Sequence, residues 1–250
     1  MSLDDDLDLL TRERDANAPD RVVLLNGFEL HCDGEPVDLP LTAQRLLGFL
    51  ALEDRTVTRS HAAATLWLDS TDKHAAASLR SALWRLRRPG YPLVEVTHAH
   101  LRLAPWVRVD YRELRAAARG LVQDGEAGPR GLLDPQRLSG ELLPDWLDDW
   151  VLLERERFRH LRLHALEALC GRLTGLGRYA AAIEAGLAAV ACEPLRESAH
   201  HLLIEAHLAE GNRTEAVRQY RWYCSLLHDE LGVRPPLTME RRIRVELRGR

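Results

Sequence analysis

The sequence lacks the features that mark membrane, secreted and disulfide-bonded proteins. No apolar run approaches the roughly 20 residues that a membrane-spanning helix needs. The amino-terminal stretch MSLDDDLDLLTRERD is acidic, whereas a secretory signal is basic and then apolar. The four cysteines lie far apart and form no C-x-x-C pair, so neither a zinc site nor a disulfide framework is indicated. We therefore expect a cytoplasmic protein with reduced thiols that does not associate with membranes.

The motifs of common enzyme classes are also missing. The chain contains no G-x-S-x-G, no H-E-x-x-H and no G-x-x-x-x-G-K-[ST] phosphate loop, and no phosphoacceptor receiver domain is evident. His160 and His164 have the i, i+4 spacing of a metal pair, but no third ligand accompanies them, so a solvated helix face explains them better. We expect no enzymatic activity, no metal and no cofactor.

Charge is distributed unevenly along a chain whose formal net charge is -4. Residues 1–20 hold seven acids against two arginines, a balance of -5, and we expect them to form an acidic, disordered tail. Residues 55–91 hold seven bases against two acids, a balance of +5. Any affinity for nucleic acid must therefore come from this local basic patch.

The pattern over residues 21–108 predicts strands, three helices and a final hairpin. Asn26-Gly27 and Asp33-Gly34 are turn signals between short strands. One helix is expected to begin at an N-cap on Thr42 and a second after Thr58. Two alternating runs around residues 98–100 predict the hairpin. This order of elements is typical of a winged helix-turn-helix domain.

The third helix is the basic segment ASLRSALWRLRRPG, which Pro89-Gly90 ends. Leu79, Leu83 and Leu86 fall on one arc and predict its buried side. The opposite side is polar and basic, which suits a DNA groove, although a basic run is often no more than a solvated helix face. Trp84 on the exposed side either meets a partner or packs on the hairpin. The predicted DNA-binding residues are Arg59, Lys73, Ser78, Arg80, Ser81, Arg85, Arg87 and Arg88.

Residues 109–250 are almost wholly helical in pattern and contain an internal repeat. Gly177 and Gly211 are 34 residues apart, and the same interval separates two further pairs: Ala182 and Ala216, and Leu169 and Leu203. This is the period of tetratricopeptide repeats, whose helical pairs cover one another's apolar faces. The predicted fold class is mainly α: a winged helix-turn-helix domain over 21–108, followed by an all-α, tetratricopeptide-like repeat domain over 109–250.

Two groups of motifs resemble one protein family. The segment L-R-S-A-L-W-R-L-R-R resembles the recognition helix of the OmpR-type winged domain in the Streptomyces antibiotic regulatory proteins. The elements E-P-L-R-E and E-L-G-V-R-P resemble the bacterial transcriptional activation domain that follows it in the same proteins. The resemblance covers residues 21–247.

The resemblance implies a transcriptional activator that binds repeated sites in double-stranded promoter DNA, with two protomers side by side, and that contacts RNA polymerase. The turn WLDSTDKHA before the basic helix is polar, and Asp69 and Asp72 are candidates for contact with a sigma factor. Asp69 and Asp72 have an alternative role as caps that stabilise the positive end of the basic helix. A second function remains open: a helical-repeat adaptor whose degenerate winged domain binds protein rather than DNA.

Overall fold

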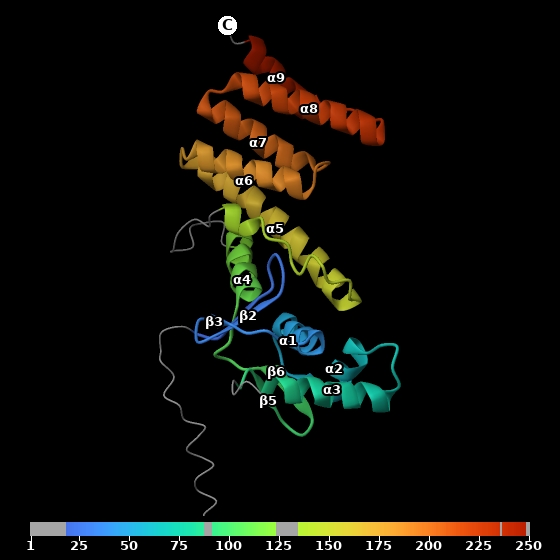
Figure 1. Cartoon of the computed structure of the whole chain (residues 1–250). Helices are drawn as coiled ribbons and strands as arrows, with labels where there is room; N and C mark the ends of the chain where they lie inside the picture. Colours follow the sequence, from blue (N-terminus) through green and yellow to red (C-terminus); the bar gives the residue numbers. More distant parts are fainter. Residues whose placement is uncertain (1–18, 88–91, 124–134, 236, 249–250) are drawn as a thin grey trace, which may run out of the picture. The chain divides into compact units, whose positions relative to one another are not determined.

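A computed structural model describes residues 19–87, 92–123, 135–235 and 237–248 (Figure 1). The chain forms two compact units. The first runs to Glu113 and also takes in Glu141–Leu152; the second comprises Leu114–Gly140 and Leu153–Arg250. Most of the predicted acidic tail lies outside the described residues. Asp20, which the sequence assigns to that tail, is buried, and its carbonyl oxygen accepts a hydrogen bond from the Arg108 N–H at 2.8 Å.

The first unit contains two small sheets. The first sheet has the order β3-β2-β1-β7, with strands at Glu35–Pro36, Glu29–Cys32, Arg21–Val23 and Arg108–Val109. In it β7 runs parallel to β1, and the other pairs are antiparallel. The second sheet is antiparallel and has the order β4-β6-β5, with strands at Val57–Thr58, His100–Leu103 and Val94–Val96. The predicted hairpin around residues 98–100 is the β5–β6 pair.

The helices of this unit are α1, α2, α3 and the start of α4, at Leu41–Glu53, Arg59–Leu66, Asp72–Arg87 and Asp110–Gln123. Helix α2 begins directly after Thr58 as predicted, and Thr58 caps it, because its side-chain oxygen accepts a hydrogen bond from the His61 N–H. The N-cap predicted at Thr42 is wrong. Pro40 occupies that position, and its carbonyl oxygen accepts bonds from the N–H groups of Ala43 and Gln44. The ring of Pro40 fixes its φ in the range that an N-cap residue adopts, and its carbonyl accepts the Ala43 N–H, which a side-chain cap could otherwise take.

Four aromatic rings hold the segment Glu141–Leu152 in the first unit. The rings of Trp146 and Phe28 stack with centroids 5.8 Å apart, and Trp150 meets Phe49 of α1 edge to face at 5.5 Å. Gly48 lies beneath them, where a Cβ atom would be 3.2 Å from the Trp146 ring. Aromatic pairs of this kind add to the free energy of burial, so this segment packs as part of the unit although it is distant in sequence.

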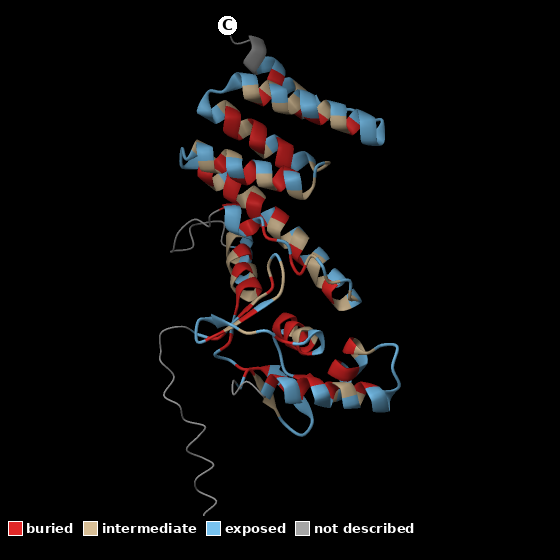
Figure 2. Ribbon diagram, viewed as in Figure 1, coloured by how far each residue is buried: buried red, intermediate tan, exposed pale blue. Residues whose placement is uncertain are grey.

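The second unit is a stack of helices. Beyond the end of α4 it contains a short 3-10 helix, η2, and helices α5, α6, α7, α8 and α9, at Pro135–Leu138, Asp149–Gly175, Tyr179–Cys192, Glu197–Glu210, Arg213–Leu231 and Leu237–Arg248. Each of α6, α7 and α8 packs on the next, and buried residues form a continuous band along α7 (Figure 2). Leu169, Leu203, Ala182 and Ala216, which the sequence repeat relates, are all fully buried. The predicted mainly helical fold, with a small sheet region before a helical repeat, is confirmed.

The 34-residue repeat also places glycines at the turns between helices. Gly177 has a φ of 71° and Gly211 a φ of 89°, in the left-handed region that favours glycine. At the end of α7 the Asn212 N–H donates to the His207 carbonyl at 2.9 Å, which is how a helix satisfies its last carbonyl groups. Both glycines are therefore needed for backbone conformation rather than for space, since no side chain crowds them within 3.4 Å.

Gly211→Ala is expected to lower the free energy of unfolding of the second unit by about 1 kcal/mol, because alanine disfavours positive φ. Gly175→Ala, at the end of α5 where φ is not positive and no atom crowds the site, is the matched control. It should leave stability unchanged or slightly raised. Urea unfolding followed by circular dichroism measures both, and equal midpoints for the two variants would contradict this assignment of the turn.

Two buried histidines lie within the helical stack. His200 stacks on Tyr223 with ring centroids 4.1 Å apart; its Nε2 bonds the Pro194 carbonyl and its Nδ1 bonds the Gln219 side chain. Burial lowers the pKa of His200 against the raising effect of the Pro194 bond. Burial likewise lowers the pKa of His207, although Glu210 and Glu215 oppose the shift. Both side chains are therefore neutral in the folded chain at neutral pH.

A lowered histidine pKa makes the unfolded chain take up protons first as the pH falls. The stability that these two neutral histidines contribute is present above the unfolded pKa of about 6.5 and is lost below it. We expect the urea concentration at the unfolding midpoint of the second unit to decrease when the pH is lowered from 7.5 to 5.5. This range lies above the pH at which carboxylates ordinarily titrate. The decrease should be smaller in His200→Gln, which removes one titrating group. A wild-type midpoint that stays constant over this range would contradict the prediction.

Candidate nucleic-acid interface

Helix α3 is held by its apolar side. Ala75, Leu79, Ala82, Leu83 and Leu86 are buried, and the helix packs against both α1 and α2. Because these positions repeat at helical spacing, they fix the rotation of α3 about its axis. The other side of the helix therefore faces solvent along its whole described length.

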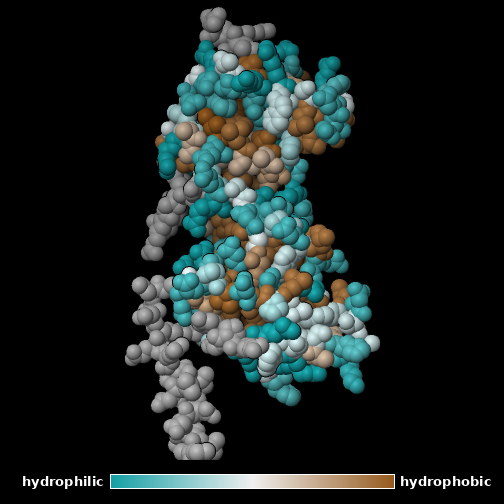
Figure 3. All heavy atoms as spheres, in the orientation of Figure 1, coloured by the Kyte–Doolittle hydropathy of each residue, from teal (hydrophilic) through white to brown (hydrophobic). Residues whose placement is uncertain are grey.

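The predicted DNA-binding residues of α3 lie on that outer side. Exposed side chains there are Lys73, Arg80, Ser81, Arg85 and Arg87. Ser78 lies at the edge and is half-buried. Arg88, which the sequence also assigned to this face, lies outside the described residues. In the space-filling view the surface over α2 and α3 is mostly hydrophilic or neutral (Figure 3).

The cations of this face differ from many other arginines of the chain in having no carboxylate partner among the described residues. Twelve of the described arginines outside α3 form ion pairs with carboxylates; Arg112 with Asp54 at 3.0 Å and Arg196 with Glu167 at 2.7 Å are examples. Among the described residues, no carboxylate forms an ion pair with the α3 cations Lys73, Arg80, Arg85 and Arg87. Their positive charge is thus available to an external anion.

The β5–β6 hairpin lies beside the start of α2. Its turn is closed by Thr97, whose side-chain oxygen accepts the His100 N–H at 3.0 Å. The backbone N–H of Arg59, the first residue of α2, donates to the Ala99 carbonyl at 2.9 Å. This bond places the predicted site residue Arg59 next to the hairpin. The exposed hairpin residues His98 and His100 therefore neighbour the predicted site, and single-residue reasoning on the basic helix missed them.

The turn between α2 and α3 carries the two predicted polymerase-contact residues in different settings. Asp69 is exposed and lies outside any helix. Asp72 is exposed and is the first residue of α3, where a carboxylate stabilises the positive end of the helix dipole. Thr71, between them, bonds the His74 ring with its side-chain oxygen at 3.2 Å. The structural role of Asp72 at the helix start does not apply to Asp69.

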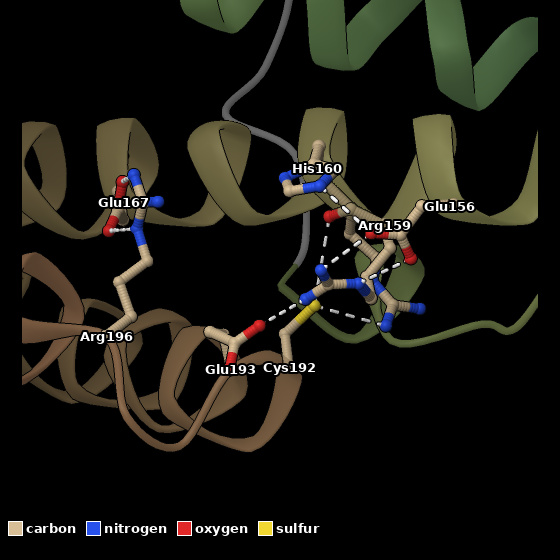
Figure 4. Close-up of polar contacts among 8 residues, drawn as sticks. Glu156, Arg159, His160, Glu167, Cys192, Glu193 and Arg196 are labelled. Carbon is tan, nitrogen blue, oxygen red and sulfur yellow. Dashed lines mark hydrogen bonds and ion pairs between the residues drawn. The ribbon is translucent and has the colours of Figure 1, made fainter. Parts of the chain in front are cut away.

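The second unit has a polar network between α5 and the end of α6. Arg159 bonds Glu193 at 2.5 Å and Glu156 at 2.8 Å, while Cys192 accepts a bond from Arg162 at 3.3 Å (Figure 4). Hydrogen bonding from Arg159 lowers the pKa of Glu156. These contacts link α5 to the end of α6, so they align the helices of the repeat.

The histidine pair of α5 belongs to the same polar surface. His160 bonds Glu156 at 3.0 Å, and His164 lies 3.6 Å from Glu167. Burial opposes ionisation of Glu167, but bonds from Arg196 and Ser198 outweigh it and keep its pKa below the usual value. Over the part of the chain that the structure describes, no group of three or more histidine, cysteine or acidic side chains could hold a metal ion. Its helices also include none both long and apolar enough to cross a bilayer.

Residues 137–247 match the family model of the bacterial transcriptional activator domain. The chain is 29% identical over 216 residues to the regulatory protein AfsR of Streptomyces coelicolor, a match that covers 81% of this chain and 22% of that protein. It is 29% identical over 226 residues to AfsR of Streptomyces griseus, covering 84% of this chain and 22% of that protein. The chain thus spans about a fifth of the length of these curated relatives.

A solved structure shares the fold. Mycobacterium tuberculosis EmbR, determined in complex with a low affinity phosphopeptide, superposes with a TM-score of 0.69 at 22% sequence identity. The match covers 92% of this chain and 65% of that one. Residues 137–247 thus resemble a bacterial transcriptional activator domain, and most of the chain, including the basic helix and the β hairpin, is similar to part of the AfsR regulatory proteins of Streptomyces.

Proposed function

We propose that this chain activates transcription by binding repeated promoter sites with α3 in the major groove and by recruiting RNA polymerase. The observation that carries the proposal is the outer face of α3, with four cations and no carboxylate paired to them among the described residues. Phosphates supply the missing counter-charge, and releasing their bound counterions favours association.

The arrangement of α2, α3 and the hairpin supports this mode of binding. A second helix that follows a first after a short turn enters the major groove in helix-turn-helix proteins. The hairpin beside the start of α2 then reaches the flanking backbone. Arg59 lies between these elements, and its place at the hairpin suits a phosphate contact.

The exposed side chains of α3 divide into two roles. Lys73, Arg80 and Arg87 recur every seven residues along one edge, which suits contact with one phosphate strand. Arg85 lies toward the other edge, together with the half-buried Ser78, and an arginine there can bond guanine with two hydrogen bonds. Ser81 lies between these edges. Arg88, which lies outside the described residues, is included only on its place in the sequence motif.

Activation needs a second contact, because DNA binding alone explains occupancy of a promoter and not recruitment. We assign this contact to the α2–α3 turn, with Asp69 as the residue that meets a basic surface of the polymerase sigma factor. Asp69 is exposed and has no part in starting α3, so it is free for this role. Two protomers side by side on direct repeats would present two such turns.

Arg85→Ala should weaken binding to a specific promoter site by about 1–3 kcal/mol, the usual contribution of a good arginine–base contact. Arg221→Ala removes the same charge from an exposed position on α8 and is the matched control. Mobility shifts on the promoter of the neighbouring operon measure both. Wild-type affinity in a folded Arg85→Ala would remove this residue from the interface.

The same titrations, repeated at several salt concentrations, test the proposal as a whole. If α3 contacts phosphates, the logarithm of affinity falls linearly with the logarithm of salt, and Arg80→Ala reduces the slope by about 1. An adaptor that binds protein through a degenerate winged domain would show no DNA binding at any salt concentration. That result would overturn the proposed function.

Asp69→Ala should leave promoter affinity unchanged and reduce transcription in a purified system with RNA polymerase, because the change removes a charge that faces the polymerase. Asp145→Ala removes an exposed carboxylate elsewhere in the first unit and is the control. Both are measured at saturating protein, where occupancy is complete. Full transcription with Asp69→Ala under these conditions would exclude the turn as the contact.

A further inference from the structure

One aromatic side chain stands at the centre of the basic face of α3. Trp84 is 59% exposed, although tryptophan has the largest side chain of all residue types and most of its surface is apolar. Exposure alone means little, since single apolar residues are common on protein surfaces. The position of Trp84 on the helix is what distinguishes it.

The outer face of α3 is built as parallel stripes. With about 100° per residue, Ala77 and Trp84 lie seven residues apart and so within about 20° of one another around the helix. Lys73, Arg80 and Arg87 form a cationic stripe on one side of this pair. The polar residues His74 and Ser81 form a stripe on the other side.

Packing of the helix on the hairpin uses a different side. Leu83 and Leu86 of α3 surround a small hollow together with Leu93, Val94 and Val96 at β5. Leu83 and Leu86 are buried, and they lie well away from Trp84 around the helix. Holding α3 against β5 therefore does not account for a tryptophan at position 84.

A helix in the major groove directs the middle of its outer face at the base edges and its flanks at the two phosphate strands. The apolar pair Ala77 and Trp84 would then face the bases, with the cationic stripe of Lys73, Arg80 and Arg87 at the phosphates. The 5-methyl group of thymine is the apolar group that base pairs present in this groove. An indole ring offers a broad apolar surface and a single N–H donor.

We propose that Trp84, supported by Ala77, is a specificity-determining residue that recognises the thymine 5-methyl group in the promoter site. This inference rests on the proposed function, because it requires α3 to bind in the major groove. It adds an apolar base contact to the arginine contacts of the flanks, and it makes the preferred sites of this chain contain thymine opposite Trp84.

The test removes the methyl group from the DNA and the indole from the protein. Wild type and Trp84→Ser each select binding sites from a random duplex library, and the wild-type site is then resynthesised with each thymine replaced singly by deoxyuridine. At one position or more, the affinity of the wild type should fall about fourfold. This is the ratio expected when the burial of one methyl-sized group is lost. The affinity of Trp84→Ser should not change on the same replacement. Trp84→Phe should show part of the loss of affinity that the wild type shows.

Leu68→Ser is the matched protein control, because Leu68 is a 71% exposed apolar residue in the turn before α3 and off the outer face of the helix. It should retain the wild-type response to deoxyuridine. If the wild type binds DNA and loses no affinity at any replaced thymine, the role of Trp84 is overturned while the proposed function stands. An equal loss of affinity in wild type and Trp84→Ser has the same consequence. A wild type that selects no DNA at all overturns the proposed function itself.

Discussion

Burial of the leucine side of α3 is the constraint on which the arrangement of the basic face depends. Leu79, Leu83 and Leu86 are at most 6% exposed, and burying each contributes about 1.5–3 kcal/mol. Rotating α3 about its axis would bring leucines into water and cations into the core. The direction in which the cations point is therefore set by apolar packing against α1 and α2, and not by the charges themselves.

Features that depend on local periodicity could be predicted from the sequence. The buried side of α3 follows from the spacing of its leucines, and the turns at Gly177 and Gly211 follow from the 34-residue interval. Features that depend on contacts between distant segments could not. Trp146 and Trp150 share a helical spacing in the sequence, but Trp146 precedes α5. The Trp146 ring packs on Phe28 and the Trp150 ring on Phe49. Nothing in a local pattern reports that pairing, because it depends on which surfaces meet after folding.

The same distinction applies to the candidate interface. Charge and spacing identified the α3 cations, yet the place of Arg59 beside the hairpin depends on one backbone hydrogen bond to Ala99, about forty residues away. The error at Thr42 has a local cause of another kind. A threonine one residue inside a helix resembles an N-cap in sequence, and only the backbone shows that Pro40 already starts the helix.

The buried leucine side of α3 stabilises the fold, and the outer face carries the candidate binding residues. This division explains how an acidic chain can have a basic face without carboxylate partners. The formal net charge is -4, so the proposed binding of DNA would depend on the local field of α3 at short range and not on the charge of the chain as a whole. Cations seven residues apart on a helix are about 10 Å apart, near the screening length in physiological salt, so their mutual repulsion costs little. Under the proposed function, Lys73, Arg80 and Arg87 would nevertheless each lie close to a phosphate. Because the leucine side supplies the packing energy, residues of the outer face can change with little effect on the fold, and a residue as large as Trp84 can be accommodated there.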